Sequence, residues 1–129
     1  MKIDTKPLKI GKNSIEVLGS WGQQDQADEV MIKLYEIDAN RDDPLKSLKA
    51  ERESMKAAMS FFKDIFHLTA KETEKIFNEV PGETMNQYLS YACGLVKGAS
   101  ERSFHDFEEE LKAQSAPKDD TQSENTEDW

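Results

Sequence analysis

The feature that most constrains the fold is a series of short amphipathic helices between Phe61 and Leu111. Apolar residues recur there every three or four positions, which places them on one face of a helix. Thr69 and Glu72 have the spacing of a capping box and predict the start of a helix that ends near Asn78. Because aromatic residues fall on these faces, the pattern predicts surfaces built to pack. We expect a mainly α protein organised as a small helical bundle.

A break at Pro81-Gly82 separates that short helix from the next one. The following helix is predicted to open at Glu83-Thr84 and to carry apolar residues as far as Ala99. Three further apolar residues continue at helical spacing: Phe104, Phe107 and Leu111. Residues 100–102 either kink this helix or continue it, and the pattern leaves both readings open.

A longer helix is predicted over residues 44–66. Asp43 and Pro44 are typical of an N-cap and a first helical position. The apolar face of this helix repeats in alternating steps of three and four, like the seam of a helical bundle, with Arg52 as an interruption. It comprises Leu45, Leu48, Met55, Met59, Phe62 and Phe66. The stripe is either a core face of the monomer or, in part, a docking surface, since methionine adapts to different packings.

The N-terminal segment predicts a short β-hairpin over residues 2–18. Apolar residues alternate in two pairs, Leu8 with Ile10 and Ile15 with Val17, around a polar turn at 11–14. A two-stranded hairpin is marginal in water, so it should lie against the helices or pair with another chain. A first helix is expected to follow over about residues 25–39, with acidic residues near its N-terminus.

Three segments are therefore expected: an N-terminal β-hairpin segment over residues 1–22, a helical body over 23–114, and a disordered acidic C-terminal tail over 115–129. The tail is rich in serine and threonine and has five acidic side chains against Lys118. It is either a solubilising extension or a partner-contacting one, with Trp129 as an anchor.

The charge of the chain restricts the classes of partner. The formal net charge is -9, whereas nucleic-acid binding needs a basic footprint, so that class is disfavoured. No apolar run approaches the roughly 20 residues of a membrane span. The first four residues lack the apolar stretch of a signal peptide. We therefore expect no nucleic acid, no membrane and a cytoplasmic location.

No residue pattern points to catalysis, a metal or a cofactor. Cys93 is the single cysteine and lies among apolar residues, which predicts a buried core thiol. His67 and His105 are too far apart for a local zinc pair. The acidic clusters are explained by helix capping and solvated helix faces, and the glycines form no phosphate-binding loop. We expect a protein that is not an enzyme.

The order of short motifs resembles a known family. Asp64-Ile65-Phe66 is followed by Glu74-Lys75-Ile76-Phe77, then by a loop and the helix around residues 88–96. Together with the short N-terminal β segment and the acidic tail, this layout resembles the small tail assembly chaperones of long-tailed, siphovirus-type bacteriophages, especially those that infect Gram-positive bacteria. The likeness is specific over residues 60–97 and holds in outline elsewhere. It implies a chaperone that binds the tape measure protein in the host cytoplasm, keeps it soluble and helps recruit tail tube subunits.

Such a chaperone needs an apolar groove for an amphipathic helix. We expect one set of apolar residues to line both the core and the groove, and the sequence does not divide them between the two roles. These candidate partner-binding residues are Met55, Met59, Phe62, Phe66, Ile76, Phe77, Tyr88 and Leu89.

Two other classes of protein remain open. One is an oligomeric structural protein of a phage particle, although ring-forming tail proteins usually need more β structure than residues 2–18 supply. The other is an acidic adaptor or inhibitor that mimics nucleic acid. Such a mimic should arrange its carboxylates on the ordered body, whereas here the tail holds a net four of the nine negative charges. Homo-oligomerisation is compatible with each class.

Overall fold

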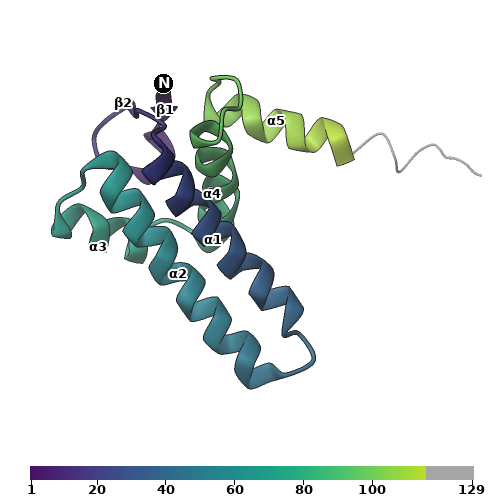
Figure 1. Cartoon of the computed structure of the whole chain (residues 1–129). Coiled ribbons are helices and arrows are strands. Elements are labelled where there is room, and N and C mark those ends of the chain that lie inside the picture. The colour runs from purple at the N-terminus through teal and green to yellow at the C-terminus, as the bar shows by residue number, and fades with distance from the viewer. Residues whose placement is uncertain (116–129) are drawn as a thin grey trace, which may run out of the picture.

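Two long antiparallel helices form the central structural unit of the molecule. In the computed structural model, which describes residues 1–115, α1 (Trp21–Ala39) and α2 (Pro44–Phe66) lie side by side (Figure 1). The ends joined by residues 40–43 project beyond the other helices. α3 (Ala70–Glu79) packs on the opposite end of α2, and α4 (Gly82–Val96) packs against α1. α5 (Phe104–Ser115) follows after a break and contacts α4. The predicted mainly α bundle is confirmed.

Local capping signals determine where the helices begin and end. At the start of α3, Thr69 Oγ1 accepts from the Glu72 N–H at 3.1 Å and the Glu72 carboxylate accepts from the Thr69 N–H at 2.9 Å, which confirms the predicted capping box. Asp43 caps α2 as expected. A second capping box, formed by Ser20 and Gln23, starts α1 at Trp21. The predicted start near residue 25 was therefore four residues late, because serine followed three residues later by glutamine is also a capping box.

The N-terminal hairpin is confirmed, and its second strand lies where it was predicted, but its predicted first strand and turn are wrong. β1 (Lys2–Asp4) pairs antiparallel with β2 (Ser14–Glu16), with Ile3 opposite Ile15. The segment expected to be the first strand instead contains a short 3-10 turn, η1 (Lys6–Leu8). Pro7 explains the difference, since proline cannot donate a ladder hydrogen bond and its fixed φ suits a helical turn.

The core is built around a cluster of aromatic rings where α2, α4 and α5 meet. Neighbouring ring centroids lie 5.5–6.5 Å apart, the range in which tilted and offset aromatic pairs are favourable. Every member is buried: Phe61, Phe62, Phe66, Tyr88, Tyr91, Phe104 and Phe107. Most of the aromatic residues of the amphipathic series therefore stabilise the monomer.

Asp4 links the hairpin to the helices through the polar edges of this cluster. Its carbonyl accepts from the Tyr88 hydroxyl at 2.6 Å, and its N–H donates to the Tyr91 hydroxyl at 3.0 Å. Its carboxylate accepts from the Phe104 N–H at 2.9 Å, at the start of α5. The Tyr91 hydroxyl also donates to the Arg102 carbonyl at 2.6 Å. These bonds place the hairpin against the helices and settle the open question at 100–102 in favour of a break.

Cys93 is a buried core thiol, as the sequence predicts. Its side chain is 3% exposed, and its sulfur lies 4.0 Å from the Ala27 carbonyl oxygen. Burial raises the pKa of the thiol to about 12, and the nearby charge of Asp28 adds to the shift.

The predicted disorder of the tail lies outside the described residues, apart from Ser115 at the end of α5.

Candidate functional site

An apolar groove opens between the α1–α2 pair and the α3–α4 unit. It has a volume of about 450 Å³, which falls in the usual range for ligand sites. Its lining comes from four helices and the α3–α4 connection: Leu34, Ile37, Glu51, Ser54, Met55, Ala58, Met59, Phe77, Val80, Gly82, Met85, Asn86 and Leu89.

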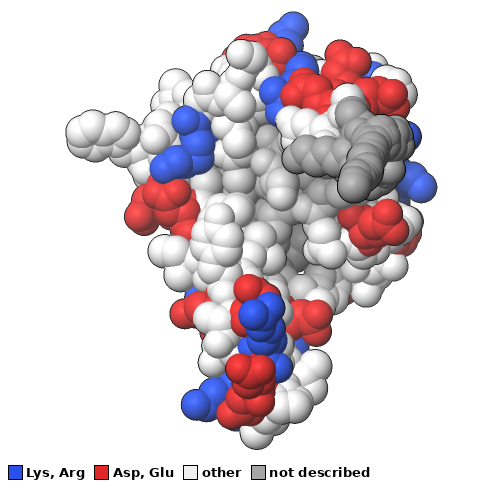
Figure 2. Space-filling view, turned by 90° about the vertical axis from the view of Figure 1, so that its right-hand side faces the viewer, with Lys and Arg blue, Asp and Glu red and all other residues white. Residues whose placement is uncertain are grey.

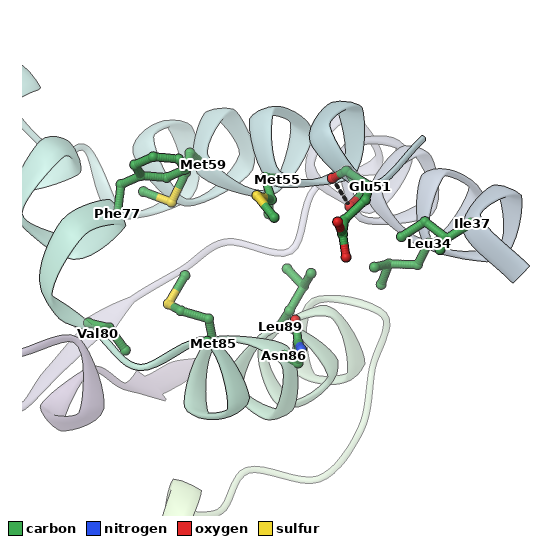
Figure 3. A pocket seen from close by; sticks show the side chains of 13 residues that line it. Leu34, Ile37, Glu51, Met55, Met59, Phe77, Val80, Met85, Asn86 and Leu89 are labelled. Carbon is green, nitrogen blue, oxygen red and sulfur yellow. Dashed lines mark hydrogen bonds between the residues drawn. The ribbon is translucent and has the colours of Figure 1, made fainter. Parts of the chain in front are cut away.

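Two pairs of side chains face each other across the groove. Met55 and Met59 on α2 point toward Met85 and Leu89 on α4, with Phe77 at one end of the opening (Figure 3). The members of each pair are four residues apart, which places them on the same side of their helix. Three of these four side chains are methionine, whose flexible thioether fits partners of different shape. The groove is therefore suited to an apolar ligand whose surface it can follow.

Polar groups occur at one end of the groove and are few. Ser54 is 4% exposed, and its hydroxyl donates to the Glu51 carbonyl at 2.7 Å in the preceding turn. That bond satisfies the serine within its own helix. The side chains of Glu51 and Asn86 are exposed, close to Leu34 and Leu89 (Figure 3). The groove thus has an apolar floor and a polar end.

The structure divides the eight predicted site residues into two groups. Four of them, Phe62, Phe66, Ile76 and Tyr88, are at most 1% exposed and belong to the core. The other four, Met55, Met59, Phe77 and Leu89, line the groove. Met55 and Phe77 are 45% and 56% exposed, so they are open to a partner.

Nine of the thirteen lining residues were not among the predicted site residues, including three large apolar residues on helices, Leu34, Ile37 and Met85. Each of these three falls on the apolar face of its helix, so the sequence carries a signal for burial. That signal does not distinguish a core position from a groove position, because the distinction depends on how α4 sits beside α1 and α2.

A comparison with known protein families identifies the chain. The model of the phage tail assembly chaperone proteins, TAC, matches residues 1–114. The chain belongs to this family. No curated protein and no solved structure matches it. Its role is therefore that of a tail assembly chaperone, and its partners are proteins of tail assembly.

In this chaperone the apolar stripe of α2 continues beyond the groove onto open surface. Leu45 and Leu48 are 62% and 59% exposed on the projecting half of the helix. An exposed apolar stripe that continues a groove in this way is typical of an interaction surface. The predicted seam is thus buried in one half of α2 and exposed in the other, so the core-face interpretation holds for the half near α3.

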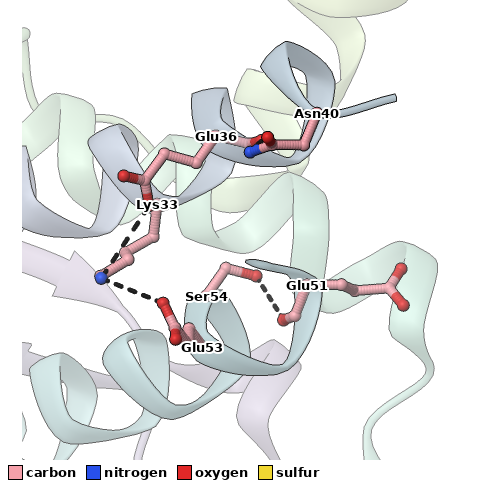
Figure 4. A network of polar contacts seen from close by, with 6 residues as sticks. All are labelled: Lys33, Glu36, Asn40, Glu51, Glu53 and Ser54. Carbon is pink, nitrogen blue, oxygen red and sulfur yellow. Dashed lines mark hydrogen bonds and ion pairs between the residues drawn. The ribbon is translucent and has the colours of Figure 1, made fainter. Parts of the chain in front are cut away.

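Charged side chains surround uncharged surface on the face of the chaperone that Figure 2 shows. Lys, Arg, Asp and Glu gather at the upper rim and on the projecting end, with uncharged residues between them. An ion pair between Lys33 on α1 and Glu53 on α2 links the two projecting helices, with Lys33 Nζ 3.2 Å from Glu53 Oε1 (Figure 4). The same Nζ lies 3.9 Å from Glu36 Oε1 on its own helix. The hydrogen bond to Glu53 raises the pKa of Lys33. Because both carboxylates are exposed and Lys33 is half-buried, these ion pairs contribute little to the stability of the fold.

Within residues 1–115 the chaperone shows no group of three or more His, Cys, Asp or Glu side chains placed to hold a metal ion. In the same part of the chain, no helix is both long and apolar enough to cross a membrane. Its two most strongly shifted pKa values belong to Tyr88 and Cys93, and burial in the core raises both. The groove is therefore the candidate site, and its chemistry is that of apolar contact.

Proposed function

We propose that the chaperone binds an amphipathic helix of the tape measure protein in the apolar groove. In this proposal it keeps that helical protein soluble in the host cytoplasm and helps recruit tail tube subunits. It acts by binding alone, without catalysis.

The observation that carries the proposal is the partial exposure of the groove and of the stripe that continues from it. From Leu48 to Met59 the apolar line on α2 extends about 16 Å at a rise of 1.5 Å per residue, or three helical turns. An amphipathic helix with apolar residues at positions i, i+3 or i+4, and i+7 has matching anchors. The groove methionines can adjust to successive segments of a long, repetitive partner.

The charge of the chain supports the same role. A net charge of -9 makes copies of the chaperone repel one another. The same negative charge keeps complexes of the chaperone with an apolar helix from associating with one another. This property suits a chaperone that holds an aggregation-prone partner.

The test is co-expression of the chaperone with the tape measure protein of the same phage, scored by soluble co-purification. The Met55→Ser/Phe77→Ser double variant removes two exposed groove contacts and should lose most of the recovered tape measure protein. The matched control is Leu18→Ser, because Leu18 is 82% exposed and lies outside the groove. The control should recover as much partner as the wild type.

Two results would contradict the proposal. Equal recovery by the groove variant and the wild type would place binding elsewhere on the chaperone. A tape measure protein that stays insoluble, while the wild-type chain elutes alone as a defined ring, would favour an oligomeric structural protein. Urea unfolding of each variant checks that lost binding does not reflect lost folding.

A further inference from the structure

A row of cationic side chains runs along α2 beside the groove. Lys49, Arg52, Lys56 and Lys63 follow one another in steps of three, four and seven residues, so they lie on one side of the helix. We call these four residues the basic row. All four are exposed. None of them takes part in an ion pair with another described residue, since the ion pairs of residues 1–115 use other cations.

The charge of α2 stands out among the α-helices of this acidic chain. α2 carries five basic and three acidic residues, whereas α1 beside it carries one basic and five acidic residues. The basic row places four cations, unpaired with other described residues, on α2, which forms one wall of the groove.

The basic row is joined to the groove by a second, shallower hollow between α2 and α3. Lys56 and Lys63 line this hollow of about 390 Å³, together with Ala70, Thr73 and Glu74. Met59 and Phe77 line both the hollow and the groove. A helix lying on Met59 and Phe77 would therefore have the two ammonium groups beside it.

We propose that the helix bound in the groove carries a row of acidic residues next to its apolar stripe, and that this acidic row pairs with the basic row. The inference rests on the proposed function and specifies the chemistry of the partner helix. Its carboxylates should recur every three or four residues, in step with the cations of α2. Arg52 offers a bidentate partner for one of them, and the lysines act as point charges.

A protein helix fits these features better than a polynucleotide does. The cations border an apolar groove that a sugar-phosphate chain would leave empty. The pairing should mainly set the register and association rate of the partner, because charges at an exposed rim act through steering and are screened by salt.

The test compares charge reversal in the basic row with a matched reversal elsewhere. The Lys56→Glu/Lys63→Glu variant of the full chain should bind the co-expressed tape measure protein at least roughly tenfold more weakly at about 50 mM salt. The control variant is Lys6→Glu/Lys12→Glu, which makes the same charge change at exposed positions of the N-terminal hairpin, outside the groove. It should bind like the wild type. Wild-type binding should weaken as salt is raised to about 500 mM.

Charge restoration provides the second arm. Acidic residues of the tape measure segment protected by the wild-type chaperone are mapped and changed to lysine. This change should restore binding to the Lys56→Glu/Lys63→Glu variant and weaken binding to the wild type. Urea unfolding of the variant should match the wild type, because both lysines are exposed.

The outcomes separate this inference from the proposed function. If charge reversal leaves binding unchanged while Met55→Ser/Phe77→Ser abolishes it, the inference is overturned and the proposed function stands. If the wild type binds no tape measure protein, both fall. A salt-sensitive self-association that charge reversal removes would identify a second copy as the occupant. An effect of charge reversal on partner binding that disappears once residues 116–129 are deleted would identify the chain's own acidic tail as the occupant. RNA bound through the basic row in place of the tape measure protein would identify a polynucleotide. Each of these three results overturns the inference.

Discussion

The two halves of α2 carry the same apolar repeat but have different surroundings. In the half near α3, Phe62 and Phe66 are at most 1% exposed among the rings of α4. In the projecting half, Leu45, Leu48 and Met55 are 45–62% exposed. α4 has only 15 residues against the 23 of α2, so it cannot cover the whole stripe. The comparison shows that one continuous apolar pattern can provide a core and a binding surface in the same helix.

The largest expected effect separates the two halves by stability. Phe62→Ala should lower the free energy of unfolding by about 3–5 kcal/mol, because it leaves a cavity beneath Tyr88 and Phe66. Phe77→Ala should lower it by less than about 1 kcal/mol, since that side chain is 56% exposed. Urea unfolding of both variants gives the difference. Equal losses would mean that the two regions do not differ as the structure shows.

Alkaline pH should destabilise the core through the buried thiol of Cys93 on α4. Burial raises the pKa of the Cys93 thiol from 9.0 to about 12, so the unfolded chain releases this proton first. Stability should therefore be unaffected below pH 9 and should fall between pH 9 and 12, by up to about 1.4 kcal/mol per pH unit. Burial also raises the pKa of Tyr88, which adds to the loss above its usual value of 10.0.

The control for the alkaline prediction is Cys93→Ala. Its free energy of unfolding, followed by urea titration at each pH, should stay flatter than the wild type between pH 9 and 10. A wild type that is equally stable at pH 8 and pH 11 would contradict the burial of these groups.

Removing a tyrosine hydroxyl should have a smaller effect on the free energy of unfolding, and the effect should differ between a buried and an exposed tyrosine. Tyr91→Phe should cost about 1–3 kcal/mol, because it leaves the Asp4 N–H and the Arg102 carbonyl without their partner. Tyr35 is 68% exposed on the projecting half, and Tyr35→Phe should change stability by less than about 0.5 kcal/mol. Thermal and urea unfolding of the two variants test the contrast. A neutral Tyr91→Phe would show that Asp4 does not hold the hairpin in place.

The smallest expected effect lies at the exposed end of the stripe. Leu48→Ser should change the free energy of unfolding by less than about 0.5 kcal/mol, because its side chain is 59% exposed. Urea unfolding measures this value, with Leu8→Ser as the buried counterpart, since Leu8 is 1% exposed. A large loss in Leu48→Ser would place this residue in the core and remove the basis of the comparison.

Features that depend on neighbouring residues could be predicted from the sequence, whereas features that depend on distant parts of the chain could not. Thr69 with Glu72 and Asp43 with Pro44 act within one helical turn, so their helix starts could be predicted from neighbours in the sequence. The first N-terminal strand could not, because Leu8 and Ile10 alternate like a strand while Pro7 and the contacts of Asp4 with α4 favour a turn. Likewise, nothing local distinguishes Phe62 from Met55 on the α2 stripe.

The sequence by itself determined the mainly α architecture, most helix ends, the buried thiol of Cys93 and the likeness to tail assembly chaperones. These follow from side-chain periodicity, capping chemistry and short motifs, all of which act over a few residues. Only the tertiary structure decided which apolar residues form the core and which line the groove, and that the basic row borders it. Burial depends on which distant helix covers a position, and α4 covers only part of the α1–α2 pair.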